Sequence, residues 1–313
     1  MASILTNVSA MTALQSLNKT NTAMEATQRQ ISTGYRVGTA EDNAAYWSIA
    51  TTMRSDNSAL STVKDALGLG AATIDVAYTA INSAIDVAKA IKDKLVAARQ
   101  PGVDRTKIQS EITELQNQLK SIADSAVFSG ENWLSTDSSA ASYNATKSIV
   151  SSFSRTNGNI TIGTISVDVT KLTLYDGGAG TSQVGILDGL RDTTGTVSPT
   201  GTFSVANISI SALTDNAADI TTLKQYIVGV DNSISEMTSS ASTLGATKQR
   251  VTLQKNFVGA LMDAVDRGIS TLVDADMTEQ STKLQALLVQ QQLGTQALSI
   301  ANQNSQNILA LFK

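Results

Sequence analysis

The side chains available for acid–base or nucleophilic chemistry in this chain are limited to lysines, carboxylates and hydroxyls. The sequence contains no histidine and no cysteine, which removes imidazole bases, thiol nucleophiles, disulfides and zinc sites with soft ligands. Lys–carboxylate or Ser–Lys chemistry stays possible in principle, but no segment concentrates those groups. We therefore expect a protein that is not an enzyme, with no catalytic residue, no cofactor and no metal site.

The polar side chains that the sequence does concentrate are amides, and they lie near the ends. Residues 284–312 carry no charged side chain and contain ten Asn and Gln residues, and residues 1–18 are also free of charged side chains. Amides at this density would be costly in a bilayer. Between packed copies of a protein they can hydrogen-bond to each other. The two ends therefore favour a subunit of a polymer over a membrane protein.

Bulk composition excludes two further classes of partner or location. The net charge is −4 and there is no basic run, so we expect no nucleic-acid partner. No stretch reaches the roughly 18 consecutive apolar residues of a membrane span, so we expect no membrane insertion. The N-terminal segment lacks a basic region and is interrupted by polar residues, which argues against a cleaved signal peptide.

Long helices are predicted on both sides of the chain's centre, because its two prolines are Pro101 and Pro199. Steps of four and three residues from Ile49 to Ala98 meet apolar side chains at thirteen of fifteen positions, and a return register runs over 108–126. Similar steps over 220–272 meet apolar side chains at fourteen of sixteen positions. These seams predict a mainly α fold, a long antiparallel helical bundle that both chain termini build.

The middle of the chain has a different pattern. Glycines crowd residues 158–201, and apolar residues alternate with Ser and Thr over 160–169, at 172 and 174, and over 203–210. This alternation predicts a small central β-hairpin region. We therefore expect paired terminal helices at 1–42 and 273–313, a helical bundle at 43–134 and 216–272, and a β-rich outer region at 135–215.

The terminal segments carry narrow apolar stripes that polar residues interrupt near the middle. Paired only with each other, two such helices would be marginal in water, so ordering them needs neighbouring copies. The predicted core contacts of the N-terminal stripe are Ile4, Val8, Met11, Leu14, Leu17, Met24 and Ile31. Those of the C-terminal stripe are Leu284, Leu287, Leu298, Ala301, Ile308 and Phe312.

Three segments carry motifs of one known protein family. The segment QISTGYRVGTAEDNAAYWSIATTMRSDNSAL (30–60) resembles the N-terminal signature of bacterial flagellins, and QALLVQQQLGTQALSIANQNSQNILALF (285–312) resembles their C-terminus. KIQSEITELQNQLKSIADSAVFSGENWL (107–134) is similar to the second helix and the turn that follows it. Tyr46-Trp47 is similar to the rhizobial, alphaproteobacterial branch. Residues 135–215 carry no such resemblance.

The resemblance implies a structural subunit of the extracellular flagellar filament, a homopolymer that sister flagellins could join. It implies terminal helices that line an inner tube, and export of the unfolded chain through the flagellar type III apparatus. The implied partners are the export machinery and its chaperone, and the hook-associated and cap proteins. Two alternatives remain: a hook–filament junction protein with similar ends, and a secreted coiled-coil adhesin that needs no ordered ends.

Four residues gain an expected role within this resemblance. Gly34 and Gly38 lie where an inner helix hands over to the bundle, which suits either a bend or a flexible linker. Arg54 and Asp56 fall near the base of the long helix, where the family makes inter-subunit contacts. A charged seam residue such as Asp56 pairs across an interface in one interpretation and faces solvent in the other.

The resemblance also bears on the vertebrate innate flagellin receptor. Enterobacterial flagellins present an Arg- and Glu-bearing helix to that receptor, and residues 84–100 match that stretch. Val87 stands where the central Arg would be, and Ala90 replaces a Glu, whereas Ile91 and Glu111 still match. We therefore expect weak receptor recognition.

Overall fold

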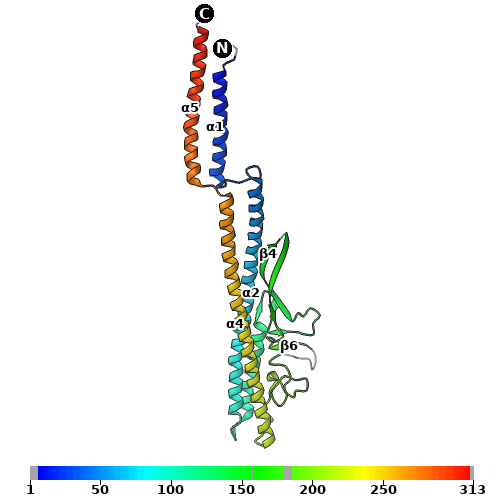
Figure 1. Ribbon diagram of the computed structural model, residues 1–313. Coiled ribbons are helices and arrows are strands. Elements are labelled where there is room, and N and C mark those ends of the chain that lie inside the picture. Colours follow the sequence, from blue (N-terminus) through cyan, green and yellow to red (C-terminus); the bar gives the residue numbers. More distant parts are fainter. Residues whose placement is uncertain (1–5, 157, 179–184, 311–313) are drawn as a thin grey trace. The chain divides into compact units, whose positions relative to one another are not determined.

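The computed structural model describes residues 6–156, 158–178 and 185–310. Within them the chain is mainly helical, with short strands near its middle, which confirms the predicted fold class (Figure 1). The elements are α1 (Val8–Thr33), α2 (Ala44–Ala97), α3 (Arg105–Ser125), β1 (Val127–Phe128), β2 (Glu131–Asn132), β3 (Ser135–Thr136), β4 (Thr146–Thr156), β5 (Asn159–Asp168), β6 (Tyr175–Asp176), η1 (Val205–Asn207), α4 (Ala217–Val273) and α5 (Met277–Ala310).

Two compact units make up the chain. The first joins Met1–Ser58 with Met262–Lys313, and the second is Ala59–Leu261. The division falls inside α2 and α4, because each of these long helices supplies residues to both units. The ranges predicted from the sequence place their boundaries elsewhere, at 42 and 273, and they stay a prediction of how the chain divides in its assembled form.

The seam of α2 and α4 lies where the heptad spacing predicts it. Seam residues of the second unit such as Leu67, Ile81 and Leu244 are fully buried. Two seam positions differ from the prediction, since Lys255 is exposed and Ile49 keeps 49% of its surface in contact with solvent. At this level of α2 the buried residue is the next one along the helix, Ala50, which packs in a cluster with Val37, Ile269 and Val273.

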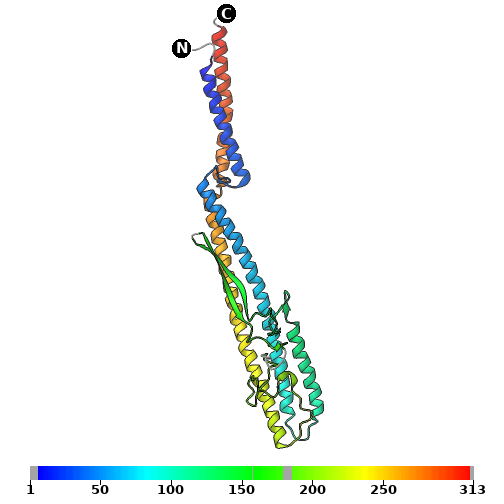
Figure 2. The same ribbon diagram turned by 90° about the vertical axis from the view of Figure 1, so that its right-hand side faces the viewer.

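In the second unit α2 and α4 run antiparallel (Figure 2). Ion pairs join the two helices at two separate levels. The ammonium of Lys92 lies 2.6 Å from Asp231, and that of Lys248 lies 2.5 Å from Asp75. The two levels are 17 residues apart on α2 (75 to 92) and also 17 residues apart on α4 (231 to 248), so the antiparallel helices stay in one register between them. Gly245 of α4 lies opposite Tyr78 of α2, where an added Cβ would make an ordinary 3.8 Å contact with the ring.

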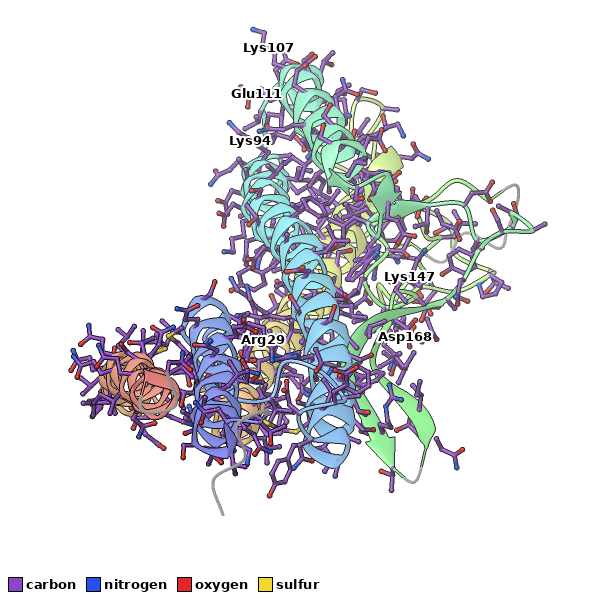
Figure 3. All side chains as sticks on the ribbon, turned by 90° about the horizontal axis from the view of Figure 1, so that it is seen from above. Arg29, Lys94, Lys107, Glu111, Lys147 and Asp168 are labelled. Atoms are coloured by element: carbon purple, nitrogen blue, oxygen red, sulfur yellow. The ribbon has the colours of Figure 1, made fainter. Side chains whose placement is uncertain are left out.

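The turn between α2 and α3 follows its sequence signals. Gly102 adopts a positive φ of 77°, and the Asp104 carboxylate caps α3 by accepting from the N–H groups of Thr106 and Lys107. Helix α3 then returns along α2, and Lys94 of α2 forms a 2.5 Å ion pair with Glu111 of α3 (Figure 3). This geometry is the antiparallel return that the second register predicts.

The β structure is smaller than the alternating pattern predicts. Strands β4 and β5 form an antiparallel hairpin with an irregularity between Val150 and Ser152, and Ile149 of β4 packs against Gly70 of α2. Figure 3 labels Lys147 on β4 and Asp168 on β5, the two strands of this hairpin. Strands β1 and β2 pair antiparallel, and β3 and β6 pair parallel, over two residues each.

The strands expected at 172–174 and 203–210 are wrong. Their apolar side chains are buried, but the backbone there forms turns, isolated bridges and η1. The backbone groups there bond to other loops and to α3 instead of to a neighbouring strand: Ile186 N donates to the Thr173 carbonyl, and Gln109 and Gln116 donate to the Ile208 carbonyl. Phe203 accepts a backbone hydrogen bond from Arg191, whose side chain is fully buried. Its guanidinium donates to the carbonyl oxygens of Gly195 and Ile186 at 2.7 and 2.6 Å, and to Glu236 of α4 at 2.7 Å.

No helix in the described part of the chain is both long enough and apolar enough to cross a membrane.

Candidate assembly surface

Helices α1 and α5 lie side by side and antiparallel in the first unit, as Figure 1 shows. The Asn7 side chain caps α1, because its Oδ1 accepts from Ala10 N at 3.0 Å, and its Nδ2 donates to the carbonyl of Ala301 on α5 at 3.0 Å. At the start of α5 the Asp276 carboxylate accepts from the N–H groups of Thr278 and Glu279. The first turns of both helices are therefore capped by side-chain oxygens, an amide in α1 and a carboxylate in α5.

The contact between α1 and α5 alternates small, apolar and amide side chains. Leu17 packs against Gly294, where an added Cβ would come within 3.2 Å of Leu17 Cδ1. One helical turn further along α1, Asn21 Oδ1 accepts a 2.8 Å hydrogen bond from Gln291 Nε2. Leu287 is buried at the same contact surface. The residues that interrupt the two stripes thus meet each other.

The predicted core residues divide into two groups by exposure. Those held at least partly between the helices are Leu17, Met24, Ile31, Leu284, Leu287, Leu298 and Ala301. Those that face away from the pair are Val8, Met11 and Leu14, with exposed fractions of 67%, 63% and 49%. Ile4 and Phe312 lie outside the described residues, as does the side chain of Ile308.

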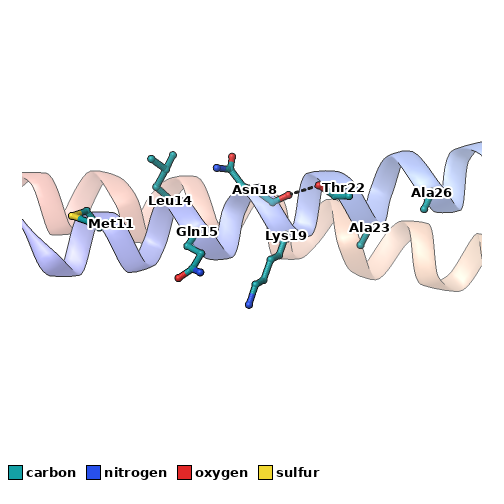
Figure 4. Close-up of a pocket in the computed structure, with 8 residues that line it drawn as sticks. All are labelled: Met11, Leu14, Gln15, Asn18, Lys19, Thr22, Ala23 and Ala26. Carbon is teal, nitrogen blue, oxygen red and sulfur yellow. Dashed lines mark hydrogen bonds between the residues drawn. The ribbon is translucent and has the colours of Figure 1, made fainter.

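An open groove of about 690 Å³ runs along α1 on the exposed side of its stripe (Figure 4). Its lining residues are Met11, Leu14, Gln15, Asn18, Lys19, Thr22, Ala23 and Ala26. Lys19 is the one charged residue among them. Thr22 donates its hydroxyl to the carbonyl of Asn18 at 3.0 Å, which satisfies that hydroxyl within the helix. Most of the groove surface is made by apolar atoms, and we name this groove the α1 groove.

Helix α5 also presents apolar residues to solvent, and the stripe prediction missed them. Leu288, Val289, Leu293 and Ile300 are 41%, 55%, 59% and 60% exposed. They lie beside the predicted stripe rather than on it. The signal that could have found them is the absence of charge over 284–312, because a charge-free helix has no face that prefers water strongly. Large apolar residues on several faces of a thin helix pair indicate contacts with other molecules.

The connection from α1 to α2 differs at its two glycines. Gly34 has a φ of 75° and ends α1 as a left-handed cap, and its carbonyl accepts from Ala275 N at 2.9 Å. Gly38 has an ordinary φ, and its N–H donates to Asp42 Oδ2 at 2.9 Å. Hydrogen bonds from the N–H groups of Thr39 and Gly38 lower the pKa of the Asp42 carboxyl. The left-handed bend is at Gly34 alone.

The two charged residues near the base of α2 have different surroundings. The guanidinium of Arg54 is exposed and stacks 4.9 Å from the ring centroid of Tyr35, a cation–π contact. Asp56 is half-buried. Tyr46, Trp47 and Ile49 add exposed apolar surface to the same end of α2. Sequence reasoning singled out the charged residues of this patch and missed the aromatic ones.

Within the described ranges, no three His, Cys, Asp or Glu residues come close enough together to hold a metal ion. What the arrangement can do is pack: it offers apolar residues, amides and few charges. Its chemistry is that of protein–protein contact.

Comparison with known proteins matches both arms of the chain. Residues 4–139 match the family model described as the bacterial flagellin N-terminal helical region, and residues 227–312 match the bacterial flagellin C-terminal helical region. The chain is 52% identical to "Flagellin C" and 43% identical to "Flagellin A" of Rhizobium meliloti (strain 1021), each over the full length of both chains. It is 41% identical to "Flagellin" of Brucella melitensis biotype 1, again over both full lengths.

Proposed function

The chain belongs to the bacterial flagellin family, and from that premise we propose how its subunits contact one another. Flagellins are structural proteins, and this one is a subunit of the extracellular flagellar filament, which it builds by polymerising with flagellin copies. The subunit is not an enzyme. The open question is which surfaces of the subunit carry the polymer contacts.

In our proposal the α1 groove and the exposed apolar face of α5 both pack against neighbouring copies. The observation that carries the proposal is the exposure of Met11, Leu14 and Leu293, at 63%, 49% and 59%, on helices with few charged side chains. Each large apolar side chain that leaves water contributes roughly 1.5–3 kcal/mol. A thin helix pair gains more from neighbours than it gains from its own contact.

Amide side chains have a second role in this proposal. Gln291 is already bonded to Asn21 within the subunit, but the exposed amides of residues 284–303 keep free donors and acceptors. In the filament they hydrogen-bond between copies or face a water-filled channel. Arg54 and Asp56 act as inter-subunit contacts near the base of α2, the helix end that also carries the exposed Trp47.

Export and end-capping are proposed by analogy with the family. The chain leaves the cell unfolded through the flagellar type III apparatus, with help from a chaperone, and hook-associated and cap proteins contact the filament ends. The slender α1–α5 pair supports this, because helices that gain stability mainly from neighbours stay easy to unfold before assembly. Co-assembly with sister flagellins is part of the same proposal.

The experiment that tests the α1 groove compares two variants of the full chain. Met11→Ser together with Leu14→Ser removes apolar area from the groove, whereas Thr12→Ala changes a neighbouring exposed residue that does not line it. We expect the double variant to raise the critical monomer concentration for filament growth at least tenfold, and Thr12→Ala to leave it unchanged. Normal growth by the double variant would contradict the proposal.

The same growth assay separates the alternatives. A hook–filament junction protein caps rather than propagates, so it would give no long filaments from purified protein. A secreted coiled-coil adhesin would keep its binding after removal of residues 1–35 and 280–313. We expect long filaments from the full chain and none after this truncation.

Weak innate-receptor recognition is a further part of the proposal. Val87 is half-buried and offers no charge, and the Ile91 side chain is fully buried against the bundle. Glu111 is engaged by Lys94 at 2.5 Å. A receptor that reads an Arg and a Glu on this helix therefore finds little to bind. A reporter-cell response as strong as that to an enteric flagellin would refute this part.

A further inference from the structure

The second unit contains a cavity that polymer assembly does not explain. It lies between the end of β5, the turn that follows it, and residues 235–247 of α4, and its volume is about 580 Å³. Cavities of 300–1,000 Å³ hold small molecules in proteins. Because hydroxyl groups dominate its α4 wall, we name it the hydroxyl groove.

The α4 wall presents oxygen atoms as acceptors. Ser239, Thr243 and Thr247 recur at four-residue intervals, so they stand in one row on the helix. Their hydroxyls donate to the carbonyls one turn back, at 3.0, 3.0 and 2.8 Å. A hydroxyl has one hydrogen and two lone pairs, so each oxygen of this row retains accepting capacity toward the groove.

Two carboxylates are fixed in the lining, each with a compensating cation. Glu236 is held by the buried guanidinium of Arg191 at 2.7 Å. Asp168 accepts from the Thr170 hydroxyl at 2.6 Å, and that bond, with a smaller contribution from the Lys171 charge, lowers the pKa of Asp168. The lining and the cation behind it are therefore close to neutral overall. Lys171 supplies donors.

Part of the remaining lining is apolar. Leu172 and Ile186 are buried and contribute to the lining, as does Val167 of β5. The turn is tied to the helix because Ser240 donates its hydroxyl to the carbonyl of Lys171 at 2.6 Å. A preformed site costs less ordering on binding than a flexible one.

We propose that the hydroxyl groove binds a neutral saccharide of one or two hexose units. Sugar hydroxyls donate to the acceptor row and to the carboxylates, the Lys171 ammonium donates to sugar oxygens, and a C–H face of the ring covers the apolar wall. An organic cation would meet Lys171, and an organic anion would meet Asp168 and Glu236. The charge pattern therefore favours a ligand without charge.

The test uses saturation-transfer NMR on the full-length monomer with glucose, galactose, mannose and maltose at millimolar concentration. Spermidine and citrate serve as the cationic and anionic comparison. Thr243→Val removes one acceptor from the row with little change in shape. Thr238→Val is the matched control, because Thr238 is exposed on α4, donates to Ile234 O at 2.7 Å, and lies outside the groove.

We expect transfer from at least one of the four sugars, at least a threefold loss of signal in Thr243→Val, and an unchanged signal in Thr238→Val. Ser239→Ala repeats the test if Thr243→Val alters the circular dichroism. The proposal is overturned if no sugar gives transfer, if the control loses as much signal as the variants, or if spermidine or citrate binds in place of the sugars. Filament growth is a separate readout that Thr243→Val leaves unchanged.

Discussion

Gln291 of α5 donates a 2.8 Å hydrogen bond to Asn21 of α1, so the residue that interrupts one apolar stripe meets the residue that interrupts the other. A polar pair inside a helix contact specifies register, because any slip leaves both groups without partners. Leu17 against Gly294 repeats this complementarity one turn away. Together the two contacts set how α1 and α5 pair.

Replacing one member of the amide pair should weaken filament growth, and replacing both should restore part of it. Asn21→Leu leaves the Gln291 amide unpaired and costs about 1 kcal/mol, which corresponds to a roughly fivefold higher critical concentration. Asn21→Leu with Gln291→Leu removes both polar groups. The critical concentrations of the wild type, both single variants and the double variant give the coupling energy. Additive effects of the single changes would show that the two side chains do not interact.

The two glycines of the α1–α2 connection should differ in their tolerance of alanine. A side chain at φ 75° costs roughly 1–2 kcal/mol, so Gly34→Ala should lower the stability of the first unit although space around it is open. Gly38→Ala meets only Asp42 Oδ2 at 3.7 Å and should be near neutral. Hydrogen exchange of α1 amides in filaments measures the difference. Equal effects would contradict a bend located at Gly34.

The buried Arg191 should make Glu236 the most sensitive charged residue of the second unit. Glu236→Ala leaves a fully buried guanidinium without its counter-charge, and because the Glu236 side chain is itself 38% exposed and Arg191 keeps two carbonyl acceptors, we expect a loss of about 1–3 kcal/mol in the free energy of unfolding. Asp86→Ala breaks an exposed pair with Lys89 and should cost well under about 1 kcal/mol. Urea denaturation followed by circular dichroism compares them. A Glu236→Ala variant as stable as Asp86→Ala would contradict the packing described around Arg191.

Asp188 should make stability fall as pH rises through weakly acidic values. Burial raises the pKa of its carboxyl to about 6, and the neighbouring charge of Asp176 adds to that effect. The folded state therefore holds a proton that the unfolded state releases near its ordinary value of 3.8, and stability decreases between about pH 4 and 6. Asp188→Asn should flatten that slope. An unchanged slope in urea denaturation at pH 4, 5 and 6 would assign the effect to another group.

The helical seams could be predicted from the sequence because a seven-residue period fixes which side chains face the partner. Leu67, Ile81 and Leu244 are buried for this reason. Lys255 shares the period and is still exposed, since its long side chain can reach solvent from a seam position. Periodicity predicts which positions lie on the seam, but it does not predict whether a flexible charged side chain at such a position is buried or reaches solvent.

The central loops could not be predicted, because their hydrogen bonds go to residues far away in the sequence. Alternation around residues 203–210 is typical of a strand, yet Phe203 bonds to the backbone of Arg191, whose partner Glu236 is 45 residues away along the chain, and Ile208 and Ile210 bond to Gln109 of α3. Nothing local to Arg191 indicates full burial. The hydroxyl groove was also beyond prediction, because it joins the β5 turn to a row on α4 through long-range contacts such as Ser240 to Lys171.

For the assembly surface, the sequence predicted the stripes and the absence of charge, but not which stripe residues face outward. Met11 and Leu17 share one stripe, and only Leu17 is held against α5. The apolar stripe of α1 covers more surface than its contact with α5 can bury, so some stripe residues stay exposed. Those exposed residues are the ones that the proposed function assigns to neighbouring copies.

The most direct test is a helical reconstruction of filaments by electron cryomicroscopy at side-chain resolution. The account predicts that Met11 and Leu14 pack against a neighbouring copy, with Val289 and Leu293 of α5 also covered and Asn21 bonded to Gln291 inside each subunit. A reconstruction in which Met11, Leu14, Val289 and Leu293 face solvent or an open channel would contradict it.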